Sequence, residues 1–457
     1  VSFGLFMIML DNTVVNVALP SIQRDLGADL SELEWIVTGY ALTFASLMLV
    51  GGKVADAYGR RRIFALGIVV FTLASLLCGL ASSSEMLIGA RVLQGIGAAL
   101  MNPATLSLIA ATFPPRQRGT AIGIWAGVSA LALAIGPLVG GLITEHLEWS
   151  WIFFVNVPIG VLGVAVSYVF IDESRDETHA SLDLPGLATS ALGLFALTYG
   201  LIEANTYGWT SPRIVGAFVL AAVSLVGFVA IERRRREPML PLDLFRSGTY
   251  TGANLVVLLV ALAMFGVFFF VSLYMQNVLG YSAVQAGAAF LPMTILIILV
   301  APLAGRTSDL IGSRGLMTAG MLLVALQLVL FSRLGADASF WNLLPALLVG
   351  GLGMSLTMTP STAAATRSVP VEKAGVGSAV LNSARQVGGT MGIAVIGAIM
   401  AAEAGGEVSI DAFMRGFEVS LLVAAGIAVV GAVVAFVLVR PHEDAGRHGH
   451  TAAEPVS

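Results

Sequence analysis

The chain has 457 residues, of which 57% are hydrophobic and only 11% are charged, and its mean hydropathy is +0.89. A soluble domain carries about 25% charged residues, so the 24 basic and 28 acidic side chains present here are too few for a water-facing surface. This excludes a soluble enzyme, a disordered chain and, with Cys78 as the single cysteine, a disulfide scaffold. The sequence predicts an all-α polytopic membrane protein.

Apolar stretches long enough to cross about 30 Å of hydrocarbon recur along the whole chain. They lie near residues 2–20, 36–55, 63–81, 86–112, 119–144, 151–171, 184–203, 213–231, 250–278, 283–304, 315–334, 341–366, 374–402 and 416–438. Fourteen transmembrane helices are therefore predicted.

Basic residues in the connections accumulate on one side of this arrangement. Of the 24 lysines and arginines, 18 fall in one set of alternate loops and ends and four in the other, while Arg91 and Arg385 lie inside spans. Because basic residues in short loops mark the cytoplasmic side, both termini are predicted to be cytoplasmic. The polar tail, residues 441–457, is expected to be disordered.

The chain is similar to itself at an offset of about 253 residues. The motif Gly52-x-x-x-Asp56-x-x-Gly59 recurs as Gly305-x-x-x-Asp309-x-x-Gly312, and Gly95-x-Gly97 recurs 256 residues later as Gly351-x-Gly353. Gln23 with Gln276, and Pro115 with Pro370, extend the match. Since the offset exceeds half the chain, an insert must separate the copies.

This pattern predicts two parallel six-helix repeats and a two-helix insert. The N-terminal bundle covers residues 1–175, the insert with its linkers 176–240, and the C-terminal bundle 241–440. Parallel halves related by an axis along the membrane normal suit a transporter in which one half moves against the other around a central site.

Five motifs resemble those of the major facilitator superfamily, specifically its fourteen-helix drug:proton antiporter branch of the QacA/EmrB type. They are LDNTVVNVALP at 10–20, GKVADAYGRRR at 52–62, RVLQG at 91–95, GPLVGG at 136–141 and WSWIFFVNVPIG at 149–160. The resemblance covers essentially the whole chain. It implies proton-driven export of drug-like or antibiotic molecules from the cell across the inner membrane.

Asp11 and Arg91 are the candidate proton-coupling residues. Asp11 lies nine residues before Pro20, about 14 Å by helix rise and so near mid-depth, where an ionisable group costs about 2.5–3.5 kcal/mol. It can carry a proton or pair with a cationic substrate, and Arg91 can hold it ionised in one conformation. In the family the matching arginine is assigned to proton coupling. The alternative is a permanent structural pair.

Further polar residues inside spans are candidates for binding substrate. Asn16 shares a helix face with Asn12, next to Asp11, and Arg385 is flanked by Asn382 and Gln386. A buried arginine with amide neighbours can recognise an anionic or carbonyl group, or it can lock two helices together. Applying the repeat offset, the second half carries Met264 and Leu347 where the first carries Asp11 and Arg91, so coupling is expected in the first half.

Two sets of residues are candidates for gating. The first occupies the paired loops and comprises Gly52, Asp56, Gly59, Arg60, Arg61, Gly305, Asp309, Gly312 and Arg314. The second is the small-residue stripe of span five, Gly136, Pro137, Gly140 and Gly141, where helix backbones can approach closely and a proline bends the helix. Positive-inside anchoring and plain packing are the respective alternatives.

The favoured function is proton:substrate antiport of amphipathic small molecules, with the proton gradient as its only energy source. No phosphate-binding loop motif occurs, which disfavours an ATP-driven pump. A dedicated exporter of an endogenous metabolite or lipid remains open, as does a non-transporting membrane sensor. No cofactor, metal or nucleic acid is expected, and the protein is expected to work as a monomer in the lipid bilayer.

Overall fold

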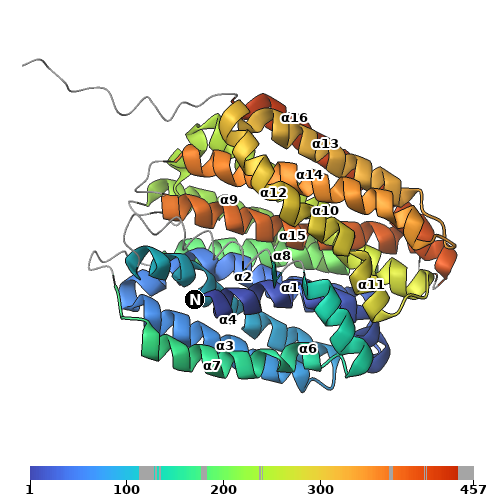
Figure 1. The fold of residues 1–457 in the computed structure, drawn as a ribbon, viewed down its shortest axis with the longest axis horizontal. Helices are drawn as coiled ribbons and strands as arrows, with labels where there is room; N and C mark the ends of the chain where they lie inside the picture. The colour runs from blue at the N-terminus through green and yellow to red at the C-terminus, as the bar shows by residue number, and fades with distance from the viewer. Residues whose placement is uncertain are drawn as a thin grey trace, which may run out of the picture.

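The computed structural model describes residues 1–112, 128, 131–132, 135–175, 183–235, 238, 240–369, 374–405, 407 and 409–440. Part of the predicted span 119–144, the paired prolines Pro115 and Pro370, and the tail 441–457 lie outside these residues. Within them the ordered structure is helical, and the model is drawn in Figure 1.

Thirteen of the predicted spans coincide with helices. Their bounds are α1 Ser2–Leu26, α2 Leu30–Tyr58, α3 Arg60–Gly79, α4 Ser84–Thr112, α6 Trp151–Phe154 with α7 Asn156–Phe170, α8 Leu184–Tyr207, α9 Pro212–Arg234, α10 Gly248–Leu273, α11 Ala283–Ala289 with α12 Leu291–Ile311, α13 Ser313–Ser332, α14 Phe340–Arg367, α15 Ala374–Ala404 and α16 Ile410–Leu438. A short 3-10 turn, Leu242–Arg246, precedes α10, and a π-helical turn, Tyr274–Val278, ends it.

Twelve helical segments in the described ranges are long and apolar enough to span a membrane, and α2, as a bent pair, makes a thirteenth. The chain is thus an all-α, multi-pass membrane protein. The two parts of α2, Leu30–Met48 and Val50–Tyr58, meet at 52°. The bend adjoins Gly51 and Gly52, which fits the usual cause of a sharp kink.

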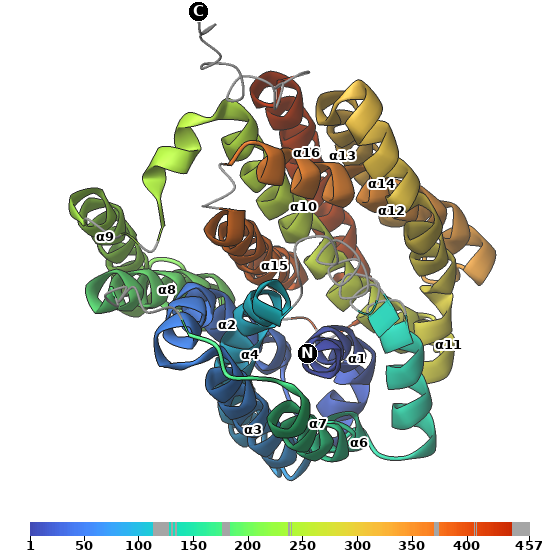
Figure 2. The same ribbon diagram turned by 60° about the vertical axis from the view of Figure 1, so that its left-hand side comes forward.

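The helices form two groups with a third element beside them. α1 to α7 lie together along one side of the molecule and α10 to α16 along the other (Figure 1). Seen from a second direction, α8 lies beside α2 and α15, which also contact each other, and α9 lies outside α8 (Figure 2). The end of the bundle that holds the arginine-rich connection between α2 and α3 is called the basic side. The other end, where α2 begins after Asp29, is called the opposite side.

Local sequence sets several helix boundaries. The Asp29 side chain accepts a hydrogen bond from the Glu32 amide at 2.8 Å, and the Glu32 side chain accepts one from the Asp29 amide at 2.9 Å. These two bonds form a capping box that begins α2. α2 and α12 end at Gly59 and Gly312, whose φ values of 111° and 86° favour glycine. The paired loop motifs therefore place their last glycines at equivalent turns.

Equivalent glycines pack at equivalent places in the two groups. A Cβ on Gly97 would lie 2.5 Å from the Phe71 amide nitrogen, and one on Gly353 would lie 2.9 Å from that of Val324. Phe71 and Val324 are themselves 253 residues apart, the offset of the sequence repeat. α4 thus approaches α3 as α14 approaches α13, at distances that only glycine permits.

We expect Gly97→Ala to destabilise the protein by about 1–3 kcal/mol, because the new methyl group would force α3 and α4 apart. Gly89→Ala, on the same helix with open space around it, is the matched control and should unfold like wild type. Thermal unfolding in detergent measures both. Equal stability of the two variants would contradict the close α3–α4 contact.

Candidate functional site

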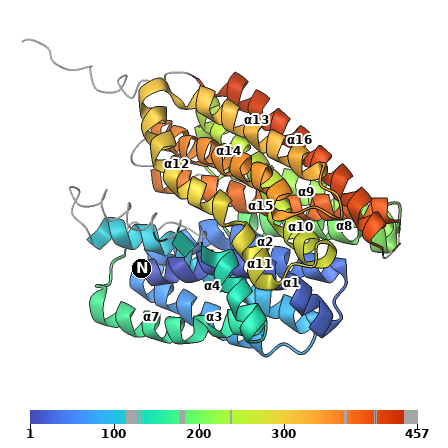
Figure 3. The same ribbon diagram turned by 45° about the vertical axis from the view of Figure 1, so that its right-hand side comes forward.

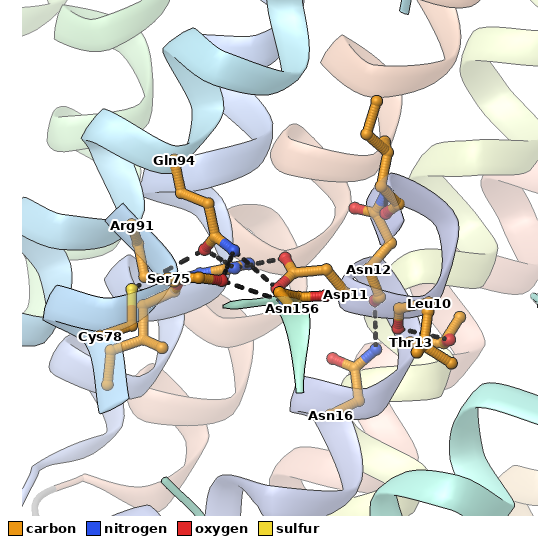
Figure 4. A network of polar contacts seen from close by, with 12 residues as sticks. Leu10, Asp11, Asn12, Thr13, Asn16, Ser75, Cys78, Arg91, Gln94 and Asn156 are labelled. Atoms are coloured by element: carbon orange, nitrogen blue, oxygen red, sulfur yellow. Dashed lines mark hydrogen bonds and ion pairs between the residues drawn. The ribbon is translucent and has the colours of Figure 1, made fainter. Parts of the chain in front are cut away.

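Asp11 and Arg91 form a buried ion pair between α1 and α4. The Arg91 Nη1 atom donates to Oδ2 of Asp11 at 2.5 Å, and both residues are 1% exposed. The predicted pairing is therefore present. Figure 4 shows the two side chains pointing toward each other from neighbouring helices.

Gln94 links the two partners and extends the network. Its Nε2 atom donates to Oδ1 of Asp11 at 2.9 Å and to Ser75 Oγ at 2.8 Å, while its Oε1 accepts from Arg91 at 2.6 Å. Asn156 donates to the same Ser75 hydroxyl at 3.0 Å. Four helices of the N-terminal group, α1, α3, α4 and α7, thus meet through one set of polar side chains.

Arg91 is held by three further contacts within this group. Its Nε donates to the Ile36 carbonyl at 3.0 Å, and its guanidinium carbon lies 4.2 Å from the ring centre of Tyr40 and 5.7 Å from that of Phe153. Such multiple contacts are what a buried ion pair needs, since desolvating two charges costs several kcal/mol per ion.

The C-terminal group has no such network at the corresponding positions. Met264 and Leu347, which stand where the repeat places Asp11 and Arg91, are each 1% exposed and belong to an apolar core. The two groups therefore differ in electrostatics although they share their helix packing.

A cavity of about 440 Å³ lies between the two groups. Most side chains in its described lining are either apolar or carry a neutral amide or hydroxyl group. They are Met9, Asn12, Thr13, Asn16, Phe44, Met48, Asn102, Pro137, Phe265, Phe268, Thr294, Ile297, Ile298, Ala301, Met354, Ser355, Met358, Thr359, Thr362, Asn382, Arg385 and Gln386. On α14 these residues run from the middle of the helix toward its basic-side end at Arg367. The cavity thus reaches from mid-depth toward the basic side.

Four of the five predicted substrate-binding residues line this cavity, and Asp11 does not. Asn16 lies there from α1, with Asn382, Arg385 and Gln386 from α15. Asp11 faces Arg91 and Gln94, while the neighbouring Asn12 and Asn16 point away from that network (Figure 4).

Arg385 is the one charged side chain in the described lining. Its Nε atom is buried without a hydrogen-bond partner, and no ion pair to Arg385 occurs among the described residues. A guanidinium with unused donors therefore faces a largely apolar cavity. This arrangement suits an acceptor-bearing ligand better than a purely helix-locking role.

Hydrogen bonds join the two groups toward the opposite side. Ser272 Oγ donates to the Asn16 carbonyl at 3.0 Å, and Gln276 Nε2 donates to the Val17 carbonyl at 2.9 Å. The Val284 amide donates to Glu145 at 2.9 Å. Figure 3 shows α11 beside α1 at this contact.

The predicted small-residue stripe lies at the same place. Cβ atoms on Gly136 and Gly140 would overlap or crowd Thr13 and Val14 of α1, whereas one on Gly141 would overlap the Ala283 carbonyl of the other group. The Pro137 carbonyl, in turn, lies against Gly287. Gly140 and Gly141 thus face different groups of helices, and the stripe holds these two groups in close contact.

On the basic side, the first loop motif is bound within its own group. Asp56 and Arg60 pair at 2.7 Å, and Glu173 accepts from the Arg61 amide at 3.1 Å. The Arg60 amide also donates to the Ser174 carbonyl at 2.9 Å. Gly52 lies close to Pro103 of α4.

The second loop motif uses a different arginine. Asp309 pairs with Arg367 of α14 at 2.9 Å, and Arg367 also donates to Ser308 and Ser313. Arg314 lies over the Phe436 ring at 4.0 Å from its centre. Gly305 is packed near Thr359, and the motif's contacts stay inside the C-terminal group.

Comparison with known proteins identifies the family. The model of the Major Facilitator Superfamily matches residues 1–393. The chain belongs to the Major Facilitator Superfamily. The family expected from the five motifs is thereby confirmed, and membership makes this protein a membrane transporter rather than an enzyme.

Curated relatives cover most of this transporter. A puromycin resistance protein of Streptomyces alboniger is 39% identical over 453 residues, which is 96% of this chain and 90% of the relative. A tetracenomycin C resistance and export protein of Streptomyces glaucescens is 38% identical, over 89% of this chain and 76% of its own. The multidrug resistance protein Stp of Mycobacterium tuberculosis is also 38% identical, over 87% and 74%.

Solved structures share the superfamily fold at low sequence identity. A D-xylose–proton symporter superposes with a TM-score of 0.68 at 14% identity and covers 96% of both chains. A bacterial homologue of the human lysosomal transporter Spinster, in an inward-facing conformation, gives 0.64 at 19% identity over 96% of this chain and 95% of its own.

Sequence reasoning missed several partners of the transporter's polar residues. Gln94 stands three residues after Arg91, so helical spacing alone places both on one face of α4 and could have revealed it. Ser75 and Glu173 lie far along the chain from the residues they contact, and nothing local marks them. Asn156 lies in the motif WSWIFFVNVPIG, but the motif does not indicate its partner. Arg367 is one of the 18 basic residues on the predicted cytoplasmic side, and the sequence does not mark it as the partner of Asp309.

We expect Arg91→Gln to destabilise the protein by about 3–5 kcal/mol, since it leaves the buried Asp11 carboxylate without its cation. The double variant Asp11→Asn with Arg91→Gln removes both charges and should recover a large part of that loss. Thermal unfolding of the single and double variants measures their coupling. Strictly additive losses would show that the pair does not act as a unit.

Proposed function

We propose that the protein exports amphipathic drug-like or antibiotic molecules by proton-coupled alternating access. The observation that carries this proposal is the cavity between two groups that are bonded together on one side, next to a buried, titratable Asp11–Arg91 pair. Relatives named for resistance to puromycin and for tetracenomycin C export support this substrate class.

The full topology is part of the proposal. It comprises fourteen spans, the predicted stretch 119–144 being the one only partly described, arranged as residues 1–175, an insert at 176–240 and residues 241–440. The basic side is the cytoplasmic side of the inner membrane, following the positive-inside rule, and holds both termini. The transporter then has its cavity toward the cytoplasm, and it acts as a monomer.

Asp11 is the proton carrier in this proposal, and Arg91 with Gln94 controls it. Arg91 donates to one carboxylate oxygen of Asp11, and Gln94 donates to the other. A proton on Asp11 removes the negative charge that holds Arg91 to α1. Because Asp11 ties α1 to α4, its protonation changes the strength of a contact inside the moving N-terminal group.

Substrate binds in the cavity without touching Asp11. Phe265, Phe268 and the methionines offer apolar surface, and Asn16, Asn382 and Gln386 offer hydrogen bonds. Arg385 binds the acceptor or anionic end of the molecule. A proton site and a substrate site in different places can exchange their ligands through the conformational change instead of through direct competition.

The loop motifs and the glycine stripe act as gates at the two ends. Asp56 with Arg60, and Asp309 with Arg367, keep the basic-side ends of α2 and α12 in order while that side is open. The contacts of Gly136, Pro137, Gly140 and Gly141 seal the opposite side. Their rupture is required for substrate to leave.

We expect Asp11→Asn to abolish puromycin uptake into inverted membrane vesicles under an imposed pH gradient, because the amide cannot carry the proton. Glu403→Gln changes an exposed carboxyl on α15 and is the matched control, with uptake expected at the wild-type rate. Unchanged gradient-driven uptake by Asp11→Asn would remove Asp11 from the coupling step.

We expect Arg385→Gln to weaken binding of 2-naphthoate about 10- to 100-fold, because the variant loses a hydrogen bond between two charged groups. Binding of the neutral 2-naphthamide should weaken less. Arg333→Gln, at an exposed position outside the cavity, is the control. Titration calorimetry on purified protein gives both dissociation constants. Equal weakening for the two probes would assign Arg385 to helix packing instead.

A further inference from the structure

Another buried carboxyl group, that of Glu34, lies where three helices meet on the opposite side. Glu34 belongs to α2 and is only 3% exposed. In the described ranges no lysine or arginine forms an ion pair with it, and no hydrogen bond reaches its carboxyl oxygens. The Asp11 network does not use it.

The surroundings of Glu34 join the N-terminal group, the insert and the C-terminal group. A Cβ on Gly397 of α15 would overlap Oε1 of Glu34, so the carboxyl group rests on the bare backbone of that helix. From α8, Glu203 accepts from Trp35 Nε1 at 3.0 Å, and Asn205 donates to the Ala398 carbonyl at 2.7 Å. The insert therefore bridges α2 and α15 beside this carboxyl.

Two acidic residues lie near Glu34. Asp29 caps the start of α2, five residues before it, and Glu203 of α8 accepts a hydrogen bond from Trp35, the next residue in the chain. On α15 the nearest ionisable residues in sequence are Glu403 and Arg385, six and twelve positions from Gly397, about 9 and 18 Å by helix rise. The hydrogen bonds of Arg91 on α4 go to Asp11, Gln94 and the Ile36 carbonyl, so Arg91 does not pair with Glu34.

A buried carboxylate without a cation or donors is costly, and a group in such a place neutralises by taking up a proton. We propose that Glu34 is a second proton-binding site, protonated while α2, α8 and α15 are in contact and ionised once their separation admits water. The proposal rests on the alternating-access part of the proposed function and not on the identity of the substrate.

At this site, proton binding directly changes the stability of the contact on the opposite side. The closed form binds one proton more than the open form, so raising the pH favours opening, by at most about tenfold in the open-to-closed ratio per pH unit. A proton arriving from the opposite side closes that side again. Through Glu203, Asn205 and the contacts with α15, the inserted helix α8 contributes to this control.

The protonation state is tested by infrared spectroscopy of the purified, full-length protein in detergent near pH 7. We expect a carbonyl-stretching band of a protonated carboxyl group that is lost in Glu34→Gln and retained in Glu403→Gln. In Glu34→Asp the band should shift, which provides a second variant with its own signal. A wild-type spectrum that Glu34→Gln leaves unchanged would overturn the proposal.

The effect on conformation is tested with spin labels at two exposed opposite-side positions, Met86→Cys on α4 and Ala402→Cys on α15, in a Cys78→Ser background. We expect the longer distance to gain population as the pH rises in the wild type and in Glu403→Gln, and to lose this dependence in Glu34→Gln. The same dependence in Glu34→Gln would overturn the proposal while leaving alternating access intact. A single, unchanging distance at every pH in the wild type would count against alternating access itself.

Discussion

The ion pair of Asp11 and Arg91 is the interaction on which the rest of the N-terminal group is arranged. Two opposite charges at mid-depth are tolerable when further hydrogen bonds surround them, and Gln94, Ser75, Asn156 and the Ile36 carbonyl supply such bonds here. Four helices are tied together as a result. The C-terminal group meets no such demand and is packed through apolar side chains and glycines.

Because of this difference, the two halves supply different parts of the candidate site. The N-terminal half holds the Asp11–Arg91 pair, and the C-terminal half supplies the cavity's cation and, from α10, two of its three lining phenylalanines, Phe265 and Phe268. Glycines at equivalent positions give the two halves the same close packing between helices. A transporter needs both properties, because rigid halves transmit a local change of charge to a distant contact.

Much of this arrangement can be predicted from the sequence, and the limits have physical causes. Apolar length located thirteen spans, because lipid requires continuous helices, and mid-membrane placement singled out Asp11, Arg91 and Arg385. Whether a side chain faces the cavity depends on rotation about the helix axis, where one residue step turns the direction by about 100°. That is why Asn12 lines the cavity and Asp11 does not. Partners such as Ser75 or Glu173 depend on tertiary packing and leave no local sign.

The bend in α2 has a consequence for how the two ends of the molecule can act. The segment Leu30–Met48 has 19 residues and measures about 28 Å, nearly the thickness of the hydrocarbon core by itself. The segment Val50–Tyr58 is therefore not needed to anchor the helix in lipid. Its angle can change at the glycine pair while Leu30–Met48 keeps its depth, so the two ends of this helix can move independently of each other.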